Sequence, residues 1–197
     1  MEAIVQFFLM ALAAAAGENA LLSRGLGLSK APLSINSIKM GILYGGLMTT
    51  VSTVSSFLTY LVGLFFQGRP YAPYIRPICF ALMVGLVYAG VYLLCKKYLP
   101  AYFKSVETLL PLASFNSALF GAIYMSLSQR HTLAQTIGYA FGTGMGFTAA
   151  MLIVYLARKR LSISHVPRAF RGLPIVLLYI GLLSLAIFSL VGHELPT

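Results

Sequence analysis

Apolar runs long enough to cross a membrane recur along the whole chain, with short polar stretches between them. A membrane-spanning helix needs about 20 mostly apolar residues, and the chain holds six runs of this kind. The expected spans cover residues 3–22, 38–66, 75–97, 106–127, 133–157 and 173–191. The pattern therefore predicts an all-α integral membrane protein, with residues 1–197 forming a single membrane domain.

One stretch between the first two runs fits neither a span nor an ordinary loop. Residues 23–37 are too few and too polar to cross a membrane, yet Gly25, Gly27 and Pro32 lie among leucines. Irregular backbone at membrane depth persists only where protein covers it or where it lines a cavity. We therefore expect this segment to be a broken stretch that packs inside the protein.

The composition supports a membrane protein and argues against nucleic acid as a partner. Mean hydropathy is +0.86 and 9% of residues are charged, whereas about a quarter of the residues in soluble domains are charged. Fourteen Lys and Arg against four Asp and Glu give a net charge of +10. These cations lie between apolar runs and form no continuous face for a phosphate backbone, so membrane lipids with anionic headgroups are the expected counterions.

The basic residues also predict an orientation, because cytoplasmic loops carry an excess of Lys and Arg. Counted in the order of the expected spans, the first, third and fifth loops hold 11 of the 14 basic residues. These are Arg24, Lys30, Lys39, Lys96, Lys97, Lys104, Arg158, Lys159, Arg160, Arg168 and Arg171, whereas the even loops hold Arg69, Arg76 and Arg130. The odd loops should face the cytoplasm, and both termini should then lie outside.

Small residues follow one face of the fifth span at every fourth position: Ala134, Gly138, Gly142, Gly146 and Ala150. Lipid gives helices no hydrophobic reason to associate, so membrane helices pair through close packing that small residues permit. The stripe predicts a tight helix contact along this span. Gly41 and Gly45 favour the same kind of contact for the second span.

Polar side chains inside the apolar runs are the candidates for a binding site. Glu18 and Asn19 close the first run, and Asn116 and Ser117 lie within the fourth. An unpaired charge or amide at this depth costs a few kcal/mol and normally faces the protein interior. Two structural alternatives remain open: Glu18 caps the broken segment or pairs with Arg24, and Asn116 ties two helices together through its amide.

Glu107 has a simpler interpretation. It begins the fourth run, where an acidic residue stabilises a helix N-terminus, so we expect it to cap that helix.

Motifs of soluble enzymes are missing from the sequence, which has no GxGxxG after a strand, no P-loop lysine motif and no HExxH. Cys79 and Cys95 are 16 residues apart in one apolar run, which suits neither a disulfide framework nor a site of several thiolates. His131, His165 and His193 lie in separate loops or tails. The sequence thus predicts no catalytic residue and no metal site.

Several segments together resemble the membrane subunits of the Rnf electron-transport complex and of the sodium-translocating NADH:quinone oxidoreductase, Nqr. The likeness covers nearly the whole chain. The segments are ENALLS at 18–23 with LGL at 26–28, LPL at 110–112 followed by Asn116, ARKRL at 157–161, VPRAFRGLPI at 166–175 and GLLSLA at 181–186.

The resemblance implies a particular fold and set of partners. It implies six transmembrane helices built as two inverted three-helix repeats, at about 1–99 and 100–197, with a broken helix in each repeat meeting its counterpart at the midplane. The broken stretches would be residues 23–37 and 110–121. Outward termini resemble the A-type Rnf or E-type Nqr member of a bacterial or archaeal cytoplasmic (inner) membrane. Expected partners are an opposite-orientation paralogous membrane protein or a second copy, and flavoprotein subunits.

The chain departs from the family at the positions that carry its cofactor. Family members place one cysteine in each broken helix, and the paired subunits hold a two-iron two-sulfur cluster with four thiolates. Ser29 and Ser117 occupy those positions here, Lys30 adds a positive charge beside the first, and a hydroxyl is a poor substitute for thiolate. Cys79 and Cys95 lie outside the broken stretches and would be roughly 24 Å apart along a helix. The cluster is therefore expected to be lost, with no cofactor in this chain.

Three functions follow as hypotheses. The first is a membrane subunit of an Rnf/Nqr-like ion-translocating electron-transport complex, acting as a non-catalytic or electron-relay subunit without its own cluster. The second is a carrier for a small solute or ion on the same inverted-repeat scaffold, and the third is a structural or assembly partner. In the first two, a midplane cavity should be lined by Glu18, Asn19, Ser29, Asn116 and Ser117.

Overall fold

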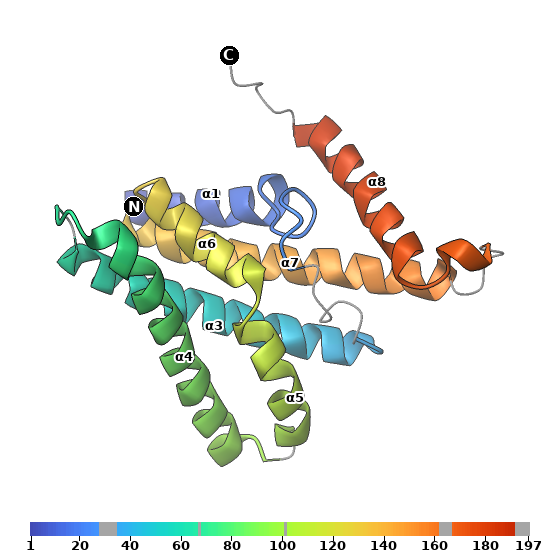
Figure 1. Ribbon diagram of the computed structural model, residues 1–197, viewed down its shortest axis with the longest axis horizontal. Helices are drawn as coiled ribbons and strands as arrows, with labels where there is room; N and C mark the ends of the chain where they lie inside the picture. The colour runs from blue at the N-terminus through green and yellow to red at the C-terminus, as the bar shows by residue number, and fades with distance from the viewer. Residues whose placement is uncertain (28–34, 67, 101, 162–166, 192–197) are drawn as a thin grey trace.

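The computed structural model describes residues 1–27, 35–66, 68–100, 102–161 and 167–191, and within these ranges every regular element is a helix. Helix α1 (Glu2–Leu12) continues into a short π-helix, η1 (Ala13–Gly17). The remaining elements are α3 (Ile38–Phe65), α4 (Ala72–Tyr98), α5 (Phe103–Ser114), α6 (Ser117–Ser128), α7 (Leu133–Leu161), the 3₁₀ turn η2 (Arg168–Phe170) and α8 (Leu173–Val191) (Figure 1).

The helices have the length and composition of a membrane protein. Helices α3, α4 and α7 are each long and apolar enough to cross a bilayer, and α5 with α6 form a fourth such unit bent by 44°. The first and last apolar segments, Glu2–Gly17 and Leu173–Ser189, are shorter. The all-α membrane fold is therefore confirmed, whereas the full count of six spans stays a prediction.

Most predicted boundaries agree with the observed ones to within four residues, but the first span was predicted too long. Regular helix ends at Gly17 instead of Leu22, because Asn19 turns the chain. Its Nδ2 donates to Ala15 O at 2.9 Å, and its Oδ1 accepts from Leu21 N at 3.1 Å and Leu22 N at 3.2 Å. These bonds satisfy the groups that a continuing helix would otherwise pair.

The expected capping role of Glu107 is also corrected. Helix α5 begins at Phe103, so Glu107 lies beyond its first turn. There the carboxylate accepts a hydrogen bond from Tyr92 Oη at 3.4 Å, which links α5 to α4.

Helices α3 and α7 form the antiparallel centre of the molecule and lie side by side along its length (Figure 1). Small residues let them approach: Gly41 faces Leu152 and Gly45 faces Thr148, while Gly144 faces Thr49. The residue numbers of the contacts fall along α7 as they rise along α3, so the two helices are antiparallel. The contact predicted for Gly41 and Gly45 is confirmed.

The glycine stripe of α7 holds α1 on another face. A Cβ at Gly138, Gly142 or Gly146 would meet backbone atoms of Phe7, Ala11 or Ala15, respectively. A collision with backbone, unlike one with a flexible side chain, cannot be relieved by a rotamer change. The predicted tight helix contact is therefore confirmed, and α1 runs parallel to α7 because both sets of numbers rise together.

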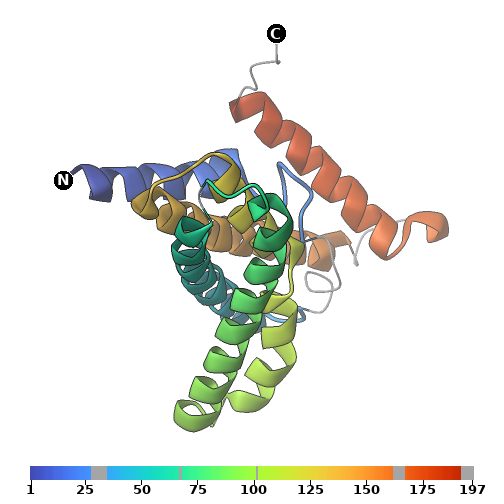
Figure 2. The same ribbon diagram turned by 60° about the vertical axis from the view of Figure 1, so that its left-hand side comes forward.

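Helix α6 runs along α3 in the same way. Tyr44 Oη donates to Leu112 O, at the end of α5, at 3.2 Å, and Gly63 lies beside Leu127 near the end of α6. Helix α1 thus runs parallel to α7 and α6 parallel to α3, and the two central helices point in opposite directions. Figure 2 shows α1 lying along α7, and Ala14 of η1 packs with Ala122 of α6 and Tyr139 of α7 in one buried cluster.

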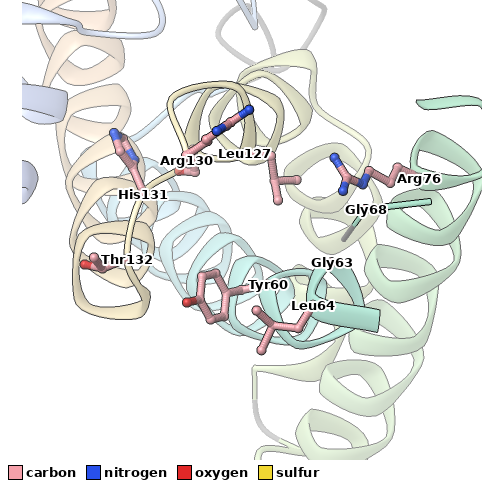
Figure 3. A pocket seen from close by; sticks show the side chains of 10 residues that line it. Tyr60, Gly63, Leu64, Gly68, Arg76, Leu127, Arg130, His131 and Thr132 are labelled. Atoms are coloured by element: carbon pink, nitrogen blue, oxygen red, sulfur yellow. The ribbon is translucent and has the colours of Figure 1, made fainter. Parts of the chain in front are cut away.

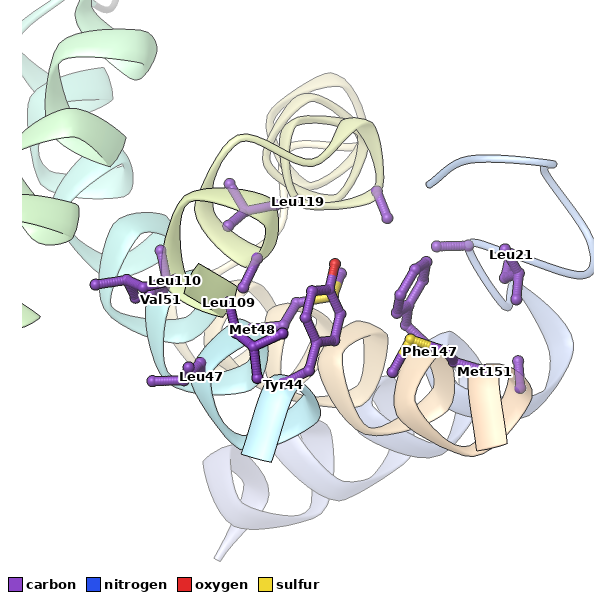
Figure 4. Close-up of a cluster of buried hydrophobic side chains, with 14 of the residues drawn as sticks. Leu21, Tyr44, Leu47, Met48, Val51, Leu109, Leu110, Leu119, Phe147 and Met151 are labelled. Carbon is purple, nitrogen blue, oxygen red and sulfur yellow. The ribbon is translucent and has the colours of Figure 1, made fainter. Parts of the chain in front are cut away.

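The buried core gathers where these elements meet, around Tyr44, Met48, Phe147 and Met151 (Figure 4). Leu21 reaches this core from the segment after η1. The outer helices differ, since α4 and α8 expose rows of large apolar side chains. These include Ile78, Leu82, Leu86, Leu93, Leu182, Leu185 and Phe188. Such faces suit lipid or a partner helix.

Candidate functional site

The two broken segments of the chain meet at one hydrogen bond. Gly27 N, in the stretch after η1, donates to Ser117 Oγ at 2.8 Å at the start of α6. Packing around this bond is close: a side chain at Gly27 would collide with the Phe147 ring and Asn116 Oδ1, and one at Gly121 would collide with Leu26. Gly27 also has a φ of +78°, which favours glycine. Residues 90 positions apart are therefore held in direct contact.

The break between α5 and α6 is formed by Asn116, which is only 1% exposed. Its Oδ1 accepts from Ala118 N at 3.0 Å and caps α6, as asparagine commonly does at a helix start. Its Nδ2 donates to Tyr44 Oη at 2.8 Å, and Tyr44 in turn donates to Leu112 O. The amide therefore ties the break to α3, which is the structural alternative that the sequence raised for this residue.

The break after η1 has the same residue type but different partners. Asn19 is 4% exposed, and all its hydrogen bonds stay within four residues. The segment that follows contacts α8, where Ser184 Oγ donates to Leu22 O. The Asn19 side chain therefore stabilises only its own turn, and other groups of this segment contact the neighbouring helices.

Glu18 supplies one of those groups. Its Oε2 accepts from Arg24 Nη2 and from Tyr139 Oη of α7, both at 2.8 Å. The side chains of Glu18 and Arg24 are 36% and 32% exposed. Arg24 also lies 3.4 Å from Met125 Sδ of α6. The ion pair that the sequence left open as an alternative is present.

The contacts of Arg24 bring it against the helices. It is counted with the first loop, and its guanidinium bonds to Glu18 and lies 3.4 Å from Met125 Sδ of α6. The turn at Asn19 directs the chain back toward these helices. The orientation argument then depends on the remaining basic residues.

The predicted site residues therefore fall into two groups. Asn116 and Ser117 lie together against Gly27, whereas Glu18 points toward Tyr139 and Arg24, and Asn19 bonds only to its own turn. Ser29 lies outside the described residues. A midplane cavity shared by all five stays a prediction.

Several polar groups in the structure were not identified by the sequence analysis. The hydroxyls of Tyr44 and Tyr139 each hold one break to a central helix. Helix α3 also buries a row of hydroxyls, of which Ser55, Ser56 and Thr59 have no hydrogen-bond partner within the described part of the chain. Ser and Thr recurring through residues 49–59 were the signal that could have revealed this row.

The donor groups present do not suit the iron–sulfur cluster that the resemblance associates with these segments. Ser117 offers a hydroxyl, already bonded to Gly27 N, where soft thiolate is required. Cys79 and Cys95 both lie on α4. Along the sequence, α4 contains neither of the two breaks. We therefore derive no step through a cluster held by these residues.

Comparison with known proteins places this chain in a family. A family model described as "Rnf-Nqr subunit, membrane protein" matches residues 7–193. The chain is 29% identical over 191 residues to the A-type subunit of the ion-translocating oxidoreductase complex of Pasteurella multocida, and the alignment covers 96% of this chain and 98% of the relative. The corresponding proteins of Syntrophotalea carbinolica and Aeromonas salmonicida are 30% and 32% identical. These alignments cover 88% and 75% of this chain, and 90% and 77% of the relatives. The chain belongs to the Rnf-Nqr family of membrane subunits.

Proposed function

We propose that this protein is a membrane subunit of an ion-translocating oxidoreductase complex and that it supports electron transfer without a cluster of its own. The observation that carries the proposal is the Gly27–Ser117 bond, which joins the two broken segments in a member of the Rnf-Nqr family. Relatives that align over nearly their full length are named as the A-type component of such a complex. The fold is retained while the ligand chemistry has changed.

The proposed architecture is six spans in two inverted repeats, about 1–99 and 100–197. Its support is the pairing of directions: α1 runs parallel to α7, α6 runs parallel to α3, and α3 opposes α7. An asparagine forms the break in each half. The opposed directions are those that an inverted repeat requires.

The proposed location is the cytoplasmic membrane of a bacterium, with both termini outside. Ten of the 14 basic residues still fall in the odd loops once Arg24 is set aside. The strongest concentration is near the end of α7, at Arg158, Lys159 and Arg160. This asymmetry favours a cytoplasmic end there.

The proposed partners are an opposite-orientation paralogous membrane protein or a second copy, together with flavoprotein subunits that carry the redox groups. Exposed apolar rows on α4 and α8 offer membrane-facing surface for a partner helix. Where family members hold a two-iron two-sulfur cluster, that group relays single electrons. In this chain Ser117 instead binds the opposite broken segment, so electron carriers must come from the partners.

A carrier for a small solute or ion is the second candidate. Two observations favour it: Glu18 is a carboxylate at a helix break, and α3 buries hydroxyls without described partners. Three cavities of the described structure have linings that include none of Glu18, Asn19 and Asn116. The carrier proposed here would bind its solute between the breaks, in a second conformation that opens there.

Purification of the full chain with the proteins that accompany it tests the proposal. We expect flavoprotein subunits to copurify, and we expect no two-iron two-sulfur paramagnetic signal from this chain on reduction. Isolation without redox partners would favour the carrier. A stoichiometric two-iron two-sulfur signal in the chain alone would overturn the loss of the cluster.

A further inference from the structure

A polar cavity of about 540 Å³ lies at the end of the central helices opposite to Arg158–Arg160. It opens among the end of α3, the start of α4, the end of α6 and the turn into α7. The lining residues are Tyr60, Gly63, Leu64, Gly68, Arg76, Ser126, Leu127, Arg130, His131 and Thr132. We name it the Arg76–Arg130 cavity.

Two arginines from different elements line this cavity. Arg76 comes from α4 and Arg130 from the turn after α6, and the Leu127 side chain lies between them in the view of Figure 3. Arg130 has a φ of +52°, so the turn holds a non-glycine residue in the left-handed region. Within the described ranges, no carboxylate forms an ion pair with either arginine.

Three polar atoms at the cavity are buried without a hydrogen-bond partner in the described part of the chain: Arg76 Nε, Ser126 Oγ and His131 Nδ1. Ser126 is 2% exposed, so its hydroxyl is closed off from bulk solvent. Buried polar groups are nearly always hydrogen-bonded, and each exception calls for a partner. All three atoms belong to residues that line one cavity, and none of them has a described hydrogen bond that a ligand there would have to displace.

The chemistry of the lining specifies the ligand. Guanidinium groups donate in a planar fork that matches paired oxygens, and Ser126 and Tyr60 add hydroxyl donors. We propose that the Arg76–Arg130 cavity binds a phosphate group, held by the two arginines and Ser126. An anionic lipid headgroup and a free phosphate are the two sources of such a group, because both present the same oxygens.

The test measures binding of inorganic phosphate to the purified full chain in zwitterionic detergent, at constant ionic strength. A second arm counts phosphatidylglycerol molecules retained by native mass spectrometry after extraction from phosphatidylcholine nanodiscs containing that lipid. The variants are Arg76→Gln with Arg130→Gln, and Arg130→Gln alone, since the exposed Arg130 side chain tolerates replacement. Arg69→Gln is the matched control, because Arg69 contacts Tyr71 in the same loop but does not line the cavity.

We expect the double variant to weaken binding of at least one probe by about tenfold or more, Arg130→Gln to weaken it less, and Arg69→Gln to leave it unchanged. Lipid retention without phosphate binding assigns the site to a headgroup, and phosphate binding alone assigns it to a free anion. Absence of both in the wild type overturns the proposal. Equal losses in Arg69→Gln and the double variant also overturn it, because they would indicate only general surface charge.

Discussion

An asparagine forms each of the two helix breaks, but its hydrogen-bond partners differ between them. At the first, Asn19 closes its own turn, and a half-exposed ion pair of Glu18 and Arg24 reaches across to Tyr139. At the second, Asn116 is almost fully buried and bonds to Tyr44 on a different helix. One break places charge beside the long helix α7, whereas the other places a neutral amide against α3.

This difference suggests that one break contributes to activity and the other to the stability of the fold. A charge inside a membrane protein is costly and commonly marks a functional position, whereas a buried neutral bond between helices mainly holds them in place. Glu18 should therefore matter more for activity and Asn116 more for folding. The two breaks would then serve different purposes.

The largest expected effect is on activity, from Glu18→Gln. The substitution keeps the shape of the side chain but removes its charge, so we expect ion-coupled electron transfer of the complex in membrane vesicles to fall by at least about tenfold. The ion pair is partly exposed, so stability should change by less than about 1 kcal/mol.

Glu107→Gln is the matched control, because Glu107, in α5, accepts only a long bond from Tyr92 and lies away from both breaks. It should retain activity. Full activity in Glu18→Gln would remove the functional half of the comparison and leave the first break as packing alone.

The next effect is on stability, from Asn116→Ala. The variant loses the cap of α6 and the bond to Tyr44, and we expect it to lower the free energy of unfolding in detergent by about 2 kcal/mol. Tyr44→Phe removes the interhelical bond from the other side. In a double-mutant cycle the two changes should be non-additive, and strict additivity would show that the bond contributes nothing.

Hydropathy and small-residue spacing predicted much of the scaffold. The spans over Ile38–Phe65, Leu133–Leu161 and Leu173–Val191 agree closely with the apolar runs. Gly138 and Gly142 indicated a close helix contact because only a missing side chain permits backbone contact. These features depend on local composition and spacing, which can be read from a single sequence.

The partners of the polar residues could not be predicted in the same way. Hydropathy treats Tyr44 and Tyr139 as ordinary members of apolar runs, yet their hydroxyls bind the two breaks. The contact of Arg24 with α6 was not predicted, because the return of the chain after Gly17 depends on side-chain bonds of Asn19. Such pairings arise from tertiary geometry, which spacing along the chain does not encode.

A smaller loss of stability is expected from Asn19→Ala. All hydrogen bonds of this side chain are local, so the variant loses a turn cap and no contact between helices. We expect a cost of about 1 kcal/mol, measured under the same conditions as Asn116→Ala. A cost as large as that of Asn116→Ala would contradict the distinction between a local and an interhelical break.

The smallest expected effect is a pH dependence at His131, which lies in the turn before α7 with its ring centroid 5.5 Å from that of Tyr139. Burial lowers the pKa of His131 below its ordinary 6.5, and the charge of Glu18 partly opposes that shift. Because the unfolded chain then binds a proton more readily, the stability that neutral His131 contributes is complete above pH 6.5 and falls as pH drops through the lower folded-state pKa.

The neighbouring groups Glu18, Arg24 and Arg130 also carry charge, so the measurement is the difference in melting temperature between wild type and His131→Gln from about pH 8 to about pH 5. Wild type should lose more stability on acidification than His131→Gln. The gap should widen in a Glu18→Gln background, because removing the carboxylate lowers the pKa of His131 further, and an unchanged gap would show that the first break does not act on this turn.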